Sequence, residues 1–254
     1  MKILIAGYGF VGKAHEEVLM DYAITDIADP VICETTVAEY ANEVDAVICC
    51  VSTPPTETGE CDMSNIYDVI SSCNTDTPIL IKSTISIEGW EAIKICFPYH
   101  NITFSPEFLV AATAVQDFKN TRHLYLGGSD VEFWSKFFSL VFEDVKITEA
   151  DPLELIMIKY GRNSFLATKV SYFNQLYDMC ESLGVDYDTV AYGIAKDKRI
   201  GKSHTKVTEE RGFGGHCFPK DTSAFVETSK QINTRLTILE AAIAYNNRLK
   251  NNDC

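Results

Sequence analysis

The sequence predicts an α/β protein in two parts, with a parallel sheet in the first part and helices in the second. In the first half, short β-rich segments alternate with segments whose apolar residues recur at helical spacing, and this alternation is typical of βαβ units. From about Asp151 the pattern changes to long helical repeats with almost no turn residues. We therefore predict a parallel-sheet domain over residues 1–148 and a helical domain over residues 149–254.

The individual elements follow from local patterns of apolar residues. The predicted strands are Lys2–Ala6, Ala23–Ala28, Ala46–Val51, Ile79–Ser83, Ile102–Phe104 and Leu124–Leu126. Helices are predicted between most of them, for example at Gly12–Met20 and Thr36–Asn42. In the second part we expect one long central helix over Leu153–Leu183, with a kink near Gly161 as an alternative, and another helix over Thr234–Leu249.

The composition limits the classes of function. The chain of 254 residues is 46% hydrophobic and carries a net charge of −14, which argues against a broad nucleic-acid-binding surface. No apolar run reaches the length of a membrane span, and Met1–Ala6 leads directly into a glycine motif with too short an apolar stretch for a signal peptide. The nine cysteines show no repeated spacing typical of disulfides or of a metal site, so reduced thiols in the cytoplasm and no metal are expected.

A glycine-rich motif follows the first predicted strand. Gly7-Tyr8-Gly9-Phe10-Val11-Gly12 opens a predicted helix, and this strand, turn and helix context is typical of a dinucleotide-binding Rossmann domain. The glycines permit a tight turn and a close approach of a pyrophosphate to the helix N-terminus. The expected cofactor contacts in this motif are Gly7, Gly9, Phe10, Val11 and Gly12.

An acidic residue at the end of the second predicted strand determines which dinucleotide is favoured. Asp29 is well spaced for this position, and Asp26 is the second choice. A carboxylate accepts a hydrogen bond from a ribose 2′-hydroxyl but repels a 2′-phosphate, so NAD is favoured over NADP. The alternative is a Rossmann-like domain that binds another nucleotide or none.

A single cysteine stands between a second glycine-rich segment and a predicted helix start. Within Gly212–Asp221, Cys217 precedes Pro219, which suits the first turn of a helix. A thiol at this place is exposed to the unpaired N–H groups of the helix end, which favour the thiolate. Lys220 adds positive charge nearby, and Asp221 lies on the same helical face as Cys217. These features predict a nucleophilic cysteine; the alternative is a buried thiol that packs as a small apolar side chain.

Several motifs together give the chain a resemblance to a known family. Besides the first glycine motif, they are Val51–Pro55 with Gly59 and Asp62, Lys82-Ser83-Thr84, Ser105–Leu109, Lys159–Lys169, Arg199-Ile200-Gly201 and Gly212–Asp221. In this order they resemble the UDP-glucose/GDP-mannose dehydrogenase family over nearly the whole chain. The resemblance implies oxidation of the C6 alcohol of a nucleotide sugar to a carboxylate, as in the conversion of UDP-glucose to UDP-glucuronate, with two molecules of NAD⁺ and a covalent thiohemiacetal and thioester on Cys217.

The resemblance also assigns roles to other residues. Lys159 and Asn163 lie one helical turn apart, so both can point at one oxyanion, and the matching family pair stabilises the developing negative charge. Asp221 and Thr84 match residues that organise an active-site water, and Asp221 is the candidate base for the first oxidation. Glu107 matches the glutamate assigned to thioester hydrolysis.

Further positions match the family's binding residues. Thr53, Thr84 and Arg122 match positions on the cofactor side. The positions expected to contact substrate are Glu107, Phe108, Leu109, Lys159, Asn163, Arg199, Phe213, Gly214 and Lys220. Arg199 matches an arginine that reaches the substrate of a neighbouring subunit, which implies a homodimer built on the helical domain. His216 stands where the family more often has serine, and a spectator role is expected for it.

The chain departs from the family pattern at two places. The resemblance ends at the helix Ile238–Arg248, beyond which the family continues into a nucleotide-binding domain of about a hundred residues. Without that domain the base has fewer contacts, so we expect weaker affinity, altered base selection, or a contribution from another chain. Val110-Ala111-Ala112 also replaces the Arg-Glu-Gly common in the family, which removes a second glutamate.

The sequence leaves three alternatives to UDP-glucose oxidation. GDP-mannose or a UDP-N-acetylhexosamine could be the substrate of the same chemistry. An ordinary two-electron dehydrogenase on this kind of fold would need no cysteine. A catalytically inactive relative would bind NAD or a partner protein without turnover, and the retained Cys217, Lys159, Asn163 and Asp221 argue against it.

Overall fold

The computed structural model describes residues 1–251 except residues 42, 57–58 and 216. The chain forms two compact units. The first comprises residues 1–56 and 61–159, and the second comprises the residues from Tyr160 onwards together with the short segment around Glu60. None of the described helices is both long enough and apolar enough to cross a membrane.

The first unit is built on a seven-stranded sheet in the order β2-β1-β3-β4-β5-β6-β7. The strands are β1 Lys2–Ala6, β2 Ile24–Ala28, β3 Ala46–Cys49, β4 Ile79–Ile81, β5 Ile102–Phe104, β6 His123–Gly128 and β7 Lys146–Glu149. Only the pairing of β5 with β6 is antiparallel. The predicted Rossmann-type α/β class is therefore confirmed.

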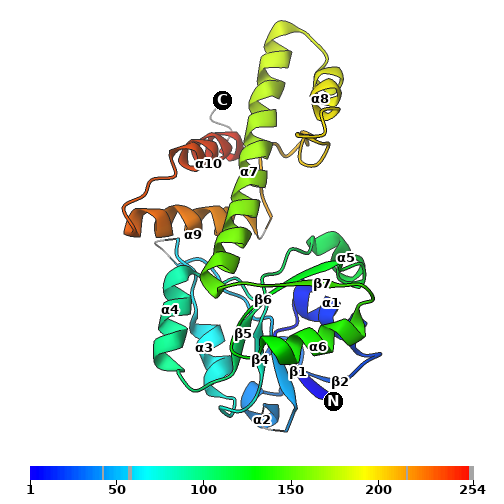
Figure 1. Cartoon of the computed structure of the whole chain (residues 1–254). Helices are drawn as coiled ribbons and strands as arrows, with labels where there is room; N and C mark the ends of the chain where they lie inside the picture. Colours follow the sequence, from blue (N-terminus) through cyan, green and yellow to red (C-terminus); the bar gives the residue numbers. More distant parts are fainter. Residues whose placement is uncertain (42, 57–58, 216, 252–254) are drawn as a thin grey trace. The chain divides into compact units, whose positions relative to one another are not determined.

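Helices cover both faces of this sheet (Figure 1). They are α1 Phe10–Leu19, α2 Val37–Tyr40, α3 Ser64–Ser71, α4 Ile87–Cys96, α5 Ala114–Lys119 and α6 Val131–Val141, with a short 3₁₀ turn η1 at Ala111–Thr113 before α5. Helices α1, α5 and α6 pack on one face, and α3 and α4 lie on the other. This division follows from right-handed crossovers that leave β1 in opposite directions along the sheet.

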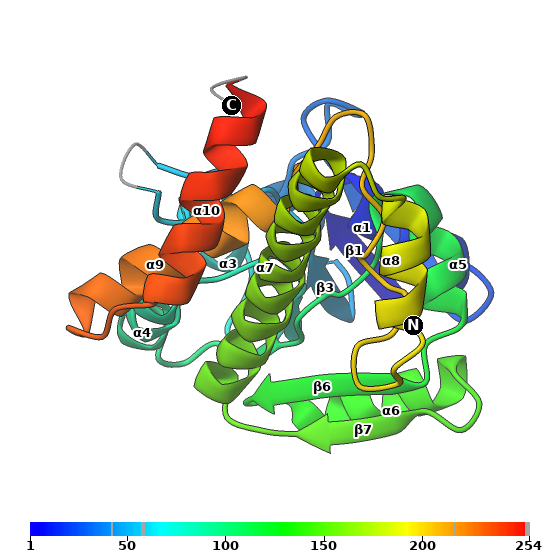
Figure 2. The same cartoon turned by 90° about the horizontal axis from the view of Figure 1, so that it is seen from above.

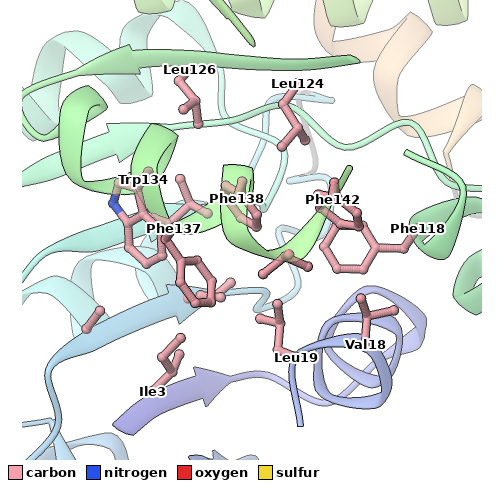
Figure 3. Packing of buried hydrophobic residues seen from close by; sticks show 14 of the residues in the cluster. Ile3, Val18, Leu19, Phe118, Leu124, Leu126, Trp134, Phe137, Phe138 and Phe142 are labelled. Atoms are coloured by element: carbon pink, nitrogen blue, oxygen red, sulfur yellow. The ribbon is translucent and has the colours of Figure 1, made fainter. Parts of the chain in front are cut away.

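A cluster of aromatic and aliphatic side chains fills the space beneath α1, α5 and α6 (Figure 3). Trp134 and Phe138 of α6 are completely buried, and their rings contact neighbouring aromatic rings at centroid distances of 6.0–6.2 Å. Burial of such large apolar surfaces is the main favourable contribution to folding. This core fixes α1, and with it the glycine loop that precedes α1.

The second unit is helical. It contains most of α7 Pro152–Leu183, together with α8 Tyr187–Ala195, α9 Phe218–Gln231 and α10 Thr237–Lys250. Phe173 and Cys180 of α7 pack against Tyr187 and Ala191 of α8 in a separate apolar cluster, so α8 folds back along the end of α7. Figure 2 shows α10 lying across α9.

Most predicted elements are present, with shifted ends. The helix predicted over Leu153–Leu183 is α7, which runs through Gly161 without interruption. Strands β3 and β4 end two residues before the predicted Val51 and Ser83, because the chain turns into loops there. The helix predicted from Thr234 begins at Thr237 instead: Asn233 adopts a φ of 58° and the Thr234 N–H donates to the Ser229 carbonyl, which closes α9.

Candidate active site

The first glycine motif lies at the point where the strand order reverses. Strand β1 is flanked by β2 on one side and β3 on the other, and ligands of open α/β sheets bind at the carboxyl ends of such strands. Gly7 has a φ of 90°, and a Cβ on it would lie 2.7 Å from the backbone of Cys50. A Cβ on Gly12 would lie 2.1 Å from the carbonyl oxygen of Gly7. Both positions therefore require glycine.

Gly9 differs from its two neighbours in the motif. Apart from Gly9 itself and its two chain neighbours, no protein atom lies within 4 Å of the place where its Cβ would be, and Gly9 directly precedes α1. The open space lies next to the first N–H groups of α1, which have no partner within the helix. This is the cradle that a dinucleotide pyrophosphate needs, so the loop fits NAD.

Asp29 is positioned beside the same loop. It follows β2, and its Oδ2 accepts a hydrogen bond of 2.6 Å from the N–H of Tyr8, while Oδ1 accepts one of 2.9 Å from Val31. Asp26, the second choice from the sequence, instead pairs with the Lys2 ammonium at 2.8 Å. The geometry therefore favours Asp29 as the ribose-binding carboxylate.

The other predicted cofactor-side residues follow neighbouring strands. Thr53 comes after β3 and is buried, and Thr84 comes after β4 and is half-buried. Arg122 is exposed, and its guanidinium donates to the Glu143 carbonyl at 3.2 Å. Because β6 is antiparallel to β5, Arg122 at the start of β6 lies at the edge where the parallel strands end.

Glu107 lies in a cluster of charged and polar side chains within the first unit. Its Oε2 is 3.2 Å from the Nζ of Lys82, and its Oε1 accepts a hydrogen bond of 2.8 Å from the N–H of Phe108. The Nζ of Lys82 also donates to the Ser105 hydroxyl at 3.0 Å. The Lys159 ammonium donates to the backbone carbonyl of Glu107 at 2.7 Å, which joins a predicted oxyanion-stabilising residue to this segment.

The electrostatics of this cluster keep Glu107 charged. Burial raises the pKa of the Glu107 carboxyl, but the Lys82 ammonium, the His15 ring and the Phe108 N–H together hold that pKa below its usual value. Burial, aided by the Lys82 charge, lowers the pKa of His15 to about 4. A neutral histidine therefore stands beside an ionised Lys82–Glu107 pair at neutral pH.

Phe108 and Leu109 complete the segment after β5. The Phe108 ring meets Tyr125 edge-on with centroids 6.0 Å apart, and the Lys159 Nζ lies 5.9 Å from the same ring. Leu109 packs on the apolar core of the first unit.

Two residues of the Glu107 cluster were not identified from the sequence. No role was assigned to Lys82, and His15 was not singled out. The sequence did contain a signal for Lys82, because a lysine within the apolar predicted strand Ile79–Ser83 is unusual.

Cys217 stands at the N-terminal end of α9, as predicted. It is the N-cap residue, and Pro219 occupies the first turn. The Asp221 N–H donates to the Cys217 carbonyl at 2.8 Å, so the two residues are one helical turn apart. The Cys217 side chain is half-buried. His216, the residue before it, lies outside the described part of the chain.

Asp221 is the most enclosed of the predicted catalytic groups. It is 1% exposed, its Oδ2 accepts a hydrogen bond of 2.6 Å from the Asn163 amide, and its Oδ1 pairs with the Lys220 ammonium at 2.9 Å. Lys159 and Asn163 are one turn apart on α7, but they donate to different acceptors, Glu107 and Asp221. The structure thus joins Asn163, Lys220 and Asp221 in the second unit.

The loop before Cys217 is held by side chains that the sequence did not identify. The Oδ1 of Asn246 in α10 accepts a hydrogen bond of 2.6 Å from the N–H of Phe213. The Oδ1 of Asn174 in α7 accepts from the N–H of Gly212 at 3.0 Å and from the Arg211 guanidinium at 2.8 Å. Both asparagines are nearly completely buried.

The predicted substrate-side residues of this loop, Phe213 and Gly214, differ in their burial. Phe213 is buried and borders a cleft of about 330 Å³ between α9 and α10, whereas Gly214 is exposed. Arg199 lies elsewhere in the second unit. It is highly exposed and donates to the Asp197 carboxylate at 2.5 Å.

These features define a Rossmann-type dinucleotide-binding domain followed by a helical region. Residues 13–145 match the NAD binding domain of the UDP-glucose/GDP-mannose dehydrogenase family, and residues 154–248 match the central domain of that family. The chain belongs to the UDP-glucose/GDP-mannose dehydrogenase family.

Individual relatives are similar to this chain in sequence or in fold. UDP-glucose 6-dehydrogenase YwqF of Bacillus subtilis is 30% identical over 84% of this chain and 51% of its own length. A UDP-glucose dehydrogenase from Pyrobaculum islandicum has a similar structure, with a TM-score of 0.85, 24% identity, and coverage of 97% of this chain and 68% of its own. A UDP-D-ManNAc dehydrogenase from Pyrococcus horikoshii gives a TM-score of 0.80 with 16% identity, 98% of this chain and 69% of its own. The chain spans about half the length of the curated relatives it matches.

Proposed function

We propose that this protein oxidises the C6 alcohol of a nucleotide sugar to the carboxylate, with UDP-glucose as the substrate and UDP-glucuronate as the product. The observation that carries the proposal is the buried Asp221 carboxylate, held by Asn163 and Lys220 one helical turn from Cys217. A base, a hydrogen-bond donor and a thiol at a helix N-terminus are the groups that covalent aldehyde oxidation requires.

The residues around the glycine loop would hold NAD. Gly7, Gly9 and Gly12 with Phe10 and Val11 shape the pyrophosphate cradle, and Asp29 would accept the ribose hydroxyl. Thr53, Thr84 and Arg122 follow or precede strands at the same edge. When bound, NAD⁺ supplies the hydride acceptor for each of the two oxidations.

The side chains of the second unit would handle protons and the covalent adduct. Asp221 takes the proton from the C6 hydroxyl as the alcohol becomes an aldehyde. The Cys217 thiolate then adds to the aldehyde carbon, and Lys159 and Asn163 donate to the oxygen that becomes negative. After the second oxidation the adduct is a thioester. Water replaces Cys217 at the carbonyl carbon, with Glu107 accepting a proton and Thr84 helping to place the water.

The binding of the sugar nucleotide rests on the same segments. Phe108, Leu109, Phe213, Gly214 and Lys220 are the proposed substrate contacts, besides the catalytic groups. GDP-mannose or a UDP-N-acetylhexosamine is the second candidate, because structural relatives are named for a UDP-N-acetylated sugar and for GDP-mannose.

The first test is NADH formation with UDP-glucose and excess NAD⁺, run to completion. We expect about two NADH per sugar consumed, as the four-electron oxidation requires. One NADH per sugar would indicate a two-electron dehydrogenase. No NADH with any of the nucleotide sugars, from folded protein, would support the inactive, assembly-type alternative.

The cysteine mechanism has a separate test. Cys217→Ser should abolish formation of the acid, because a serine hydroxyl is a far weaker nucleophile at neutral pH. Cys96→Ser is the matched control, since Cys96 is an exposed free thiol on α4 and should leave turnover unchanged. Full acid production by Cys217→Ser would refute the covalent mechanism.

We further propose that the protein acts in the cytoplasm as a homodimer formed through the helical region. The eight cysteines in the described part of the chain are all free thiols, which supports a reducing compartment. Phe165, Tyr172 and Met179 on α7 are 68%, 58% and 61% exposed and recur every seven residues, so they form one apolar stripe suited to a second copy of α7.

A further inference from the structure

Lys82 is a buried lysine without a role in the chemistry described so far. Its side chain is 1% exposed, and its ammonium contacts the Glu107 carboxylate at 3.2 Å and the Ser105 hydroxyl at 3.0 Å. Lys82 follows β4, whereas Ser105 and Glu107 follow the neighbouring β5. The parallel pairing of these strands therefore places the three side chains together at the carboxyl edge of the sheet.

Because Lys82 and Glu107 are buried, breaking their ion pair would be costly in free energy. A buried charge is costly unless it is paired and hydrogen-bonded. Oε1 of Glu107 accepts a hydrogen bond from the Phe108 N–H, whereas Oε2 is buried and makes only the ion pair with Lys82. The Glu107 side chain is only 11% exposed. Lys82 is thus the cation that balances the Glu107 carboxylate and also fixes its direction.

Two of the other titratable groups around Glu107 are neutral at physiological pH in the wild-type protein. His15 in α1 is neutral at physiological pH because burial lowers its pKa to about 4. Burial raises the pKa of the Cys50 thiol after β3, so that thiol is neutral as well. Lys159 in α7 contacts the backbone carbonyl of Glu107.

We propose that Lys82 is a positioning residue that keeps Glu107 ionised and oriented as the base for thioester hydrolysis. The inference rests on the proposed function. In this step a water oxygen bonds to the thioester carbonyl carbon as one of its protons passes to Glu107. The C–S bond then breaks, the electron pair leaves on the Cys217 sulfur, and no oxidant or reductant is consumed.

The direct test follows the titration of the Glu107 carboxyl by ¹³C NMR, assigned with Glu107→Gln. In the wild-type protein this carboxyl should titrate below its ordinary pKa of 4.5. In Lys82→Met the burial is no longer opposed by the cation, so the pKa should rise by more than about one unit. Lys82→Arg keeps the charge and should keep the low value. Lys2→Met breaks the Lys2–Asp26 pair and should leave Glu107 unchanged.

The kinetic test uses the same variants. Lys82→Met should move the acidic limb of the pH profile of turnover to higher pH, with little change in KM, and it should cause thioester to accumulate on Cys217. In a Glu107→Gln background, Lys82→Met should add no further loss of hydrolysis. If Lys82→Met alone unfolds, the double variant still provides a folded sample, because it leaves no unpaired charge buried.

An unchanged Glu107 titration in Lys82→Met would overturn the inference, and so would additive losses in the double variant. Because the NMR titration requires no turnover, it stands even if the wild-type protein oxidises no nucleotide sugar. Failure of the proposed function and failure of the role of Lys82 are therefore distinguishable.

Discussion

His15 links protonation to stability within a single side chain. Its ring is fully buried and stacks on Phe118 with centroids 4.0 Å apart. Burial lowers its pKa from 6.5 to about 4, with a further lowering from Lys82. Between these values the unfolded chain binds a proton that the folded protein does not. The contribution of His15 to stability is therefore complete above pH 6.5 and is lost as the pH falls through about 4.

This difference predicts a measurable change in the free energy of unfolding. The pKa of His15 differs by about two and a half units between the unfolded and folded states. This difference corresponds to a loss on the order of 3 kcal/mol in the free energy of unfolding between pH 6.5 and 4. His15→Phe keeps an aromatic ring and should remove this part of the pH dependence in denaturant titrations. His123→Phe changes an exposed histidine and should retain it. Parallel stability curves for wild type and His15→Phe would contradict the assignment.

At the scale of elements, two substitutions in the glycine loop before α1 should distinguish an effect on NAD binding from an effect on folding. A Cβ at Gly9 would enter open space, whereas one at Gly12 would meet the Gly7 carbonyl at 2.1 Å. We expect Gly9→Ala to melt close to wild type but to bind NAD at least about ten-fold more weakly, since the added methyl fills the cradle. Gly12→Ala should instead lower the melting temperature. Calorimetric titration with NAD and thermal unfolding distinguish the two effects.

Gly212 in the turn before Cys217 and Gly184 after α7 form a second matched pair of glycines. Gly212 and Gly184 have similar φ values of 63° and 67°, but only a Cβ on Gly212 would collide, at 2.3 Å from the Asn246 Oδ1. Gly184→Ala should therefore cost about 1–2 kcal/mol of stability for the left-handed conformation. Gly212→Ala should cost a further 1–3 kcal/mol or so, because it also disrupts the buried hydrogen bond from Phe213 to Asn246. Equal losses in urea unfolding would show that Asn246 does not hold the loop.

The elements that the sequence predicted well are those whose signal is local. Strands β1 and β5 have the predicted bounds, because each is a short apolar run between polar residues. Strand β7 was not predicted, since Lys146–Glu149 is largely exposed and lacks an alternating pattern. Helix α8 was also missed, although Asp186 caps it through the Thr189 N–H at 2.8 Å.

The candidate site shows the same division between local and distant information. The glycine loop and the Cys217 helix start could be predicted because each lies within about ten residues. The Asn163–Asp221 hydrogen bond joins residues 58 positions apart, and the Lys82–Ser105 bond joins residues 23 apart. Such contacts depend on helix packing and strand order, which a pattern of residues along one chain does not specify.

At the scale of the whole molecule, the exposed stripe on α7 predicts self-association. Phe165, Tyr172 and Met179 lie on one face of the helix because they recur every seven residues. Tyr172→Glu should convert a dimer to a monomer in light scattering, since a charge in an apolar interface is costly. Ile95→Glu alters a similarly exposed side chain on α4 and should leave the mass unchanged.

The proposed role of Arg199 makes the dimer part of the active site, and this can be tested by complementation. If Arg199 of one copy reaches the substrate bound at Cys217 of the other, Arg199→Ala and Cys217→Ser should each be inactive alone. Co-expressed, they form mixed dimers in which one site combines the intact Cys217 of one copy with the intact Arg199 of the other. Random pairing of two-fold symmetric copies should restore about a quarter of the wild-type activity. If wild type is a monomer at the assay concentration, or the mixed sample is inactive despite forming mixed dimers, Arg199 does not act across the interface.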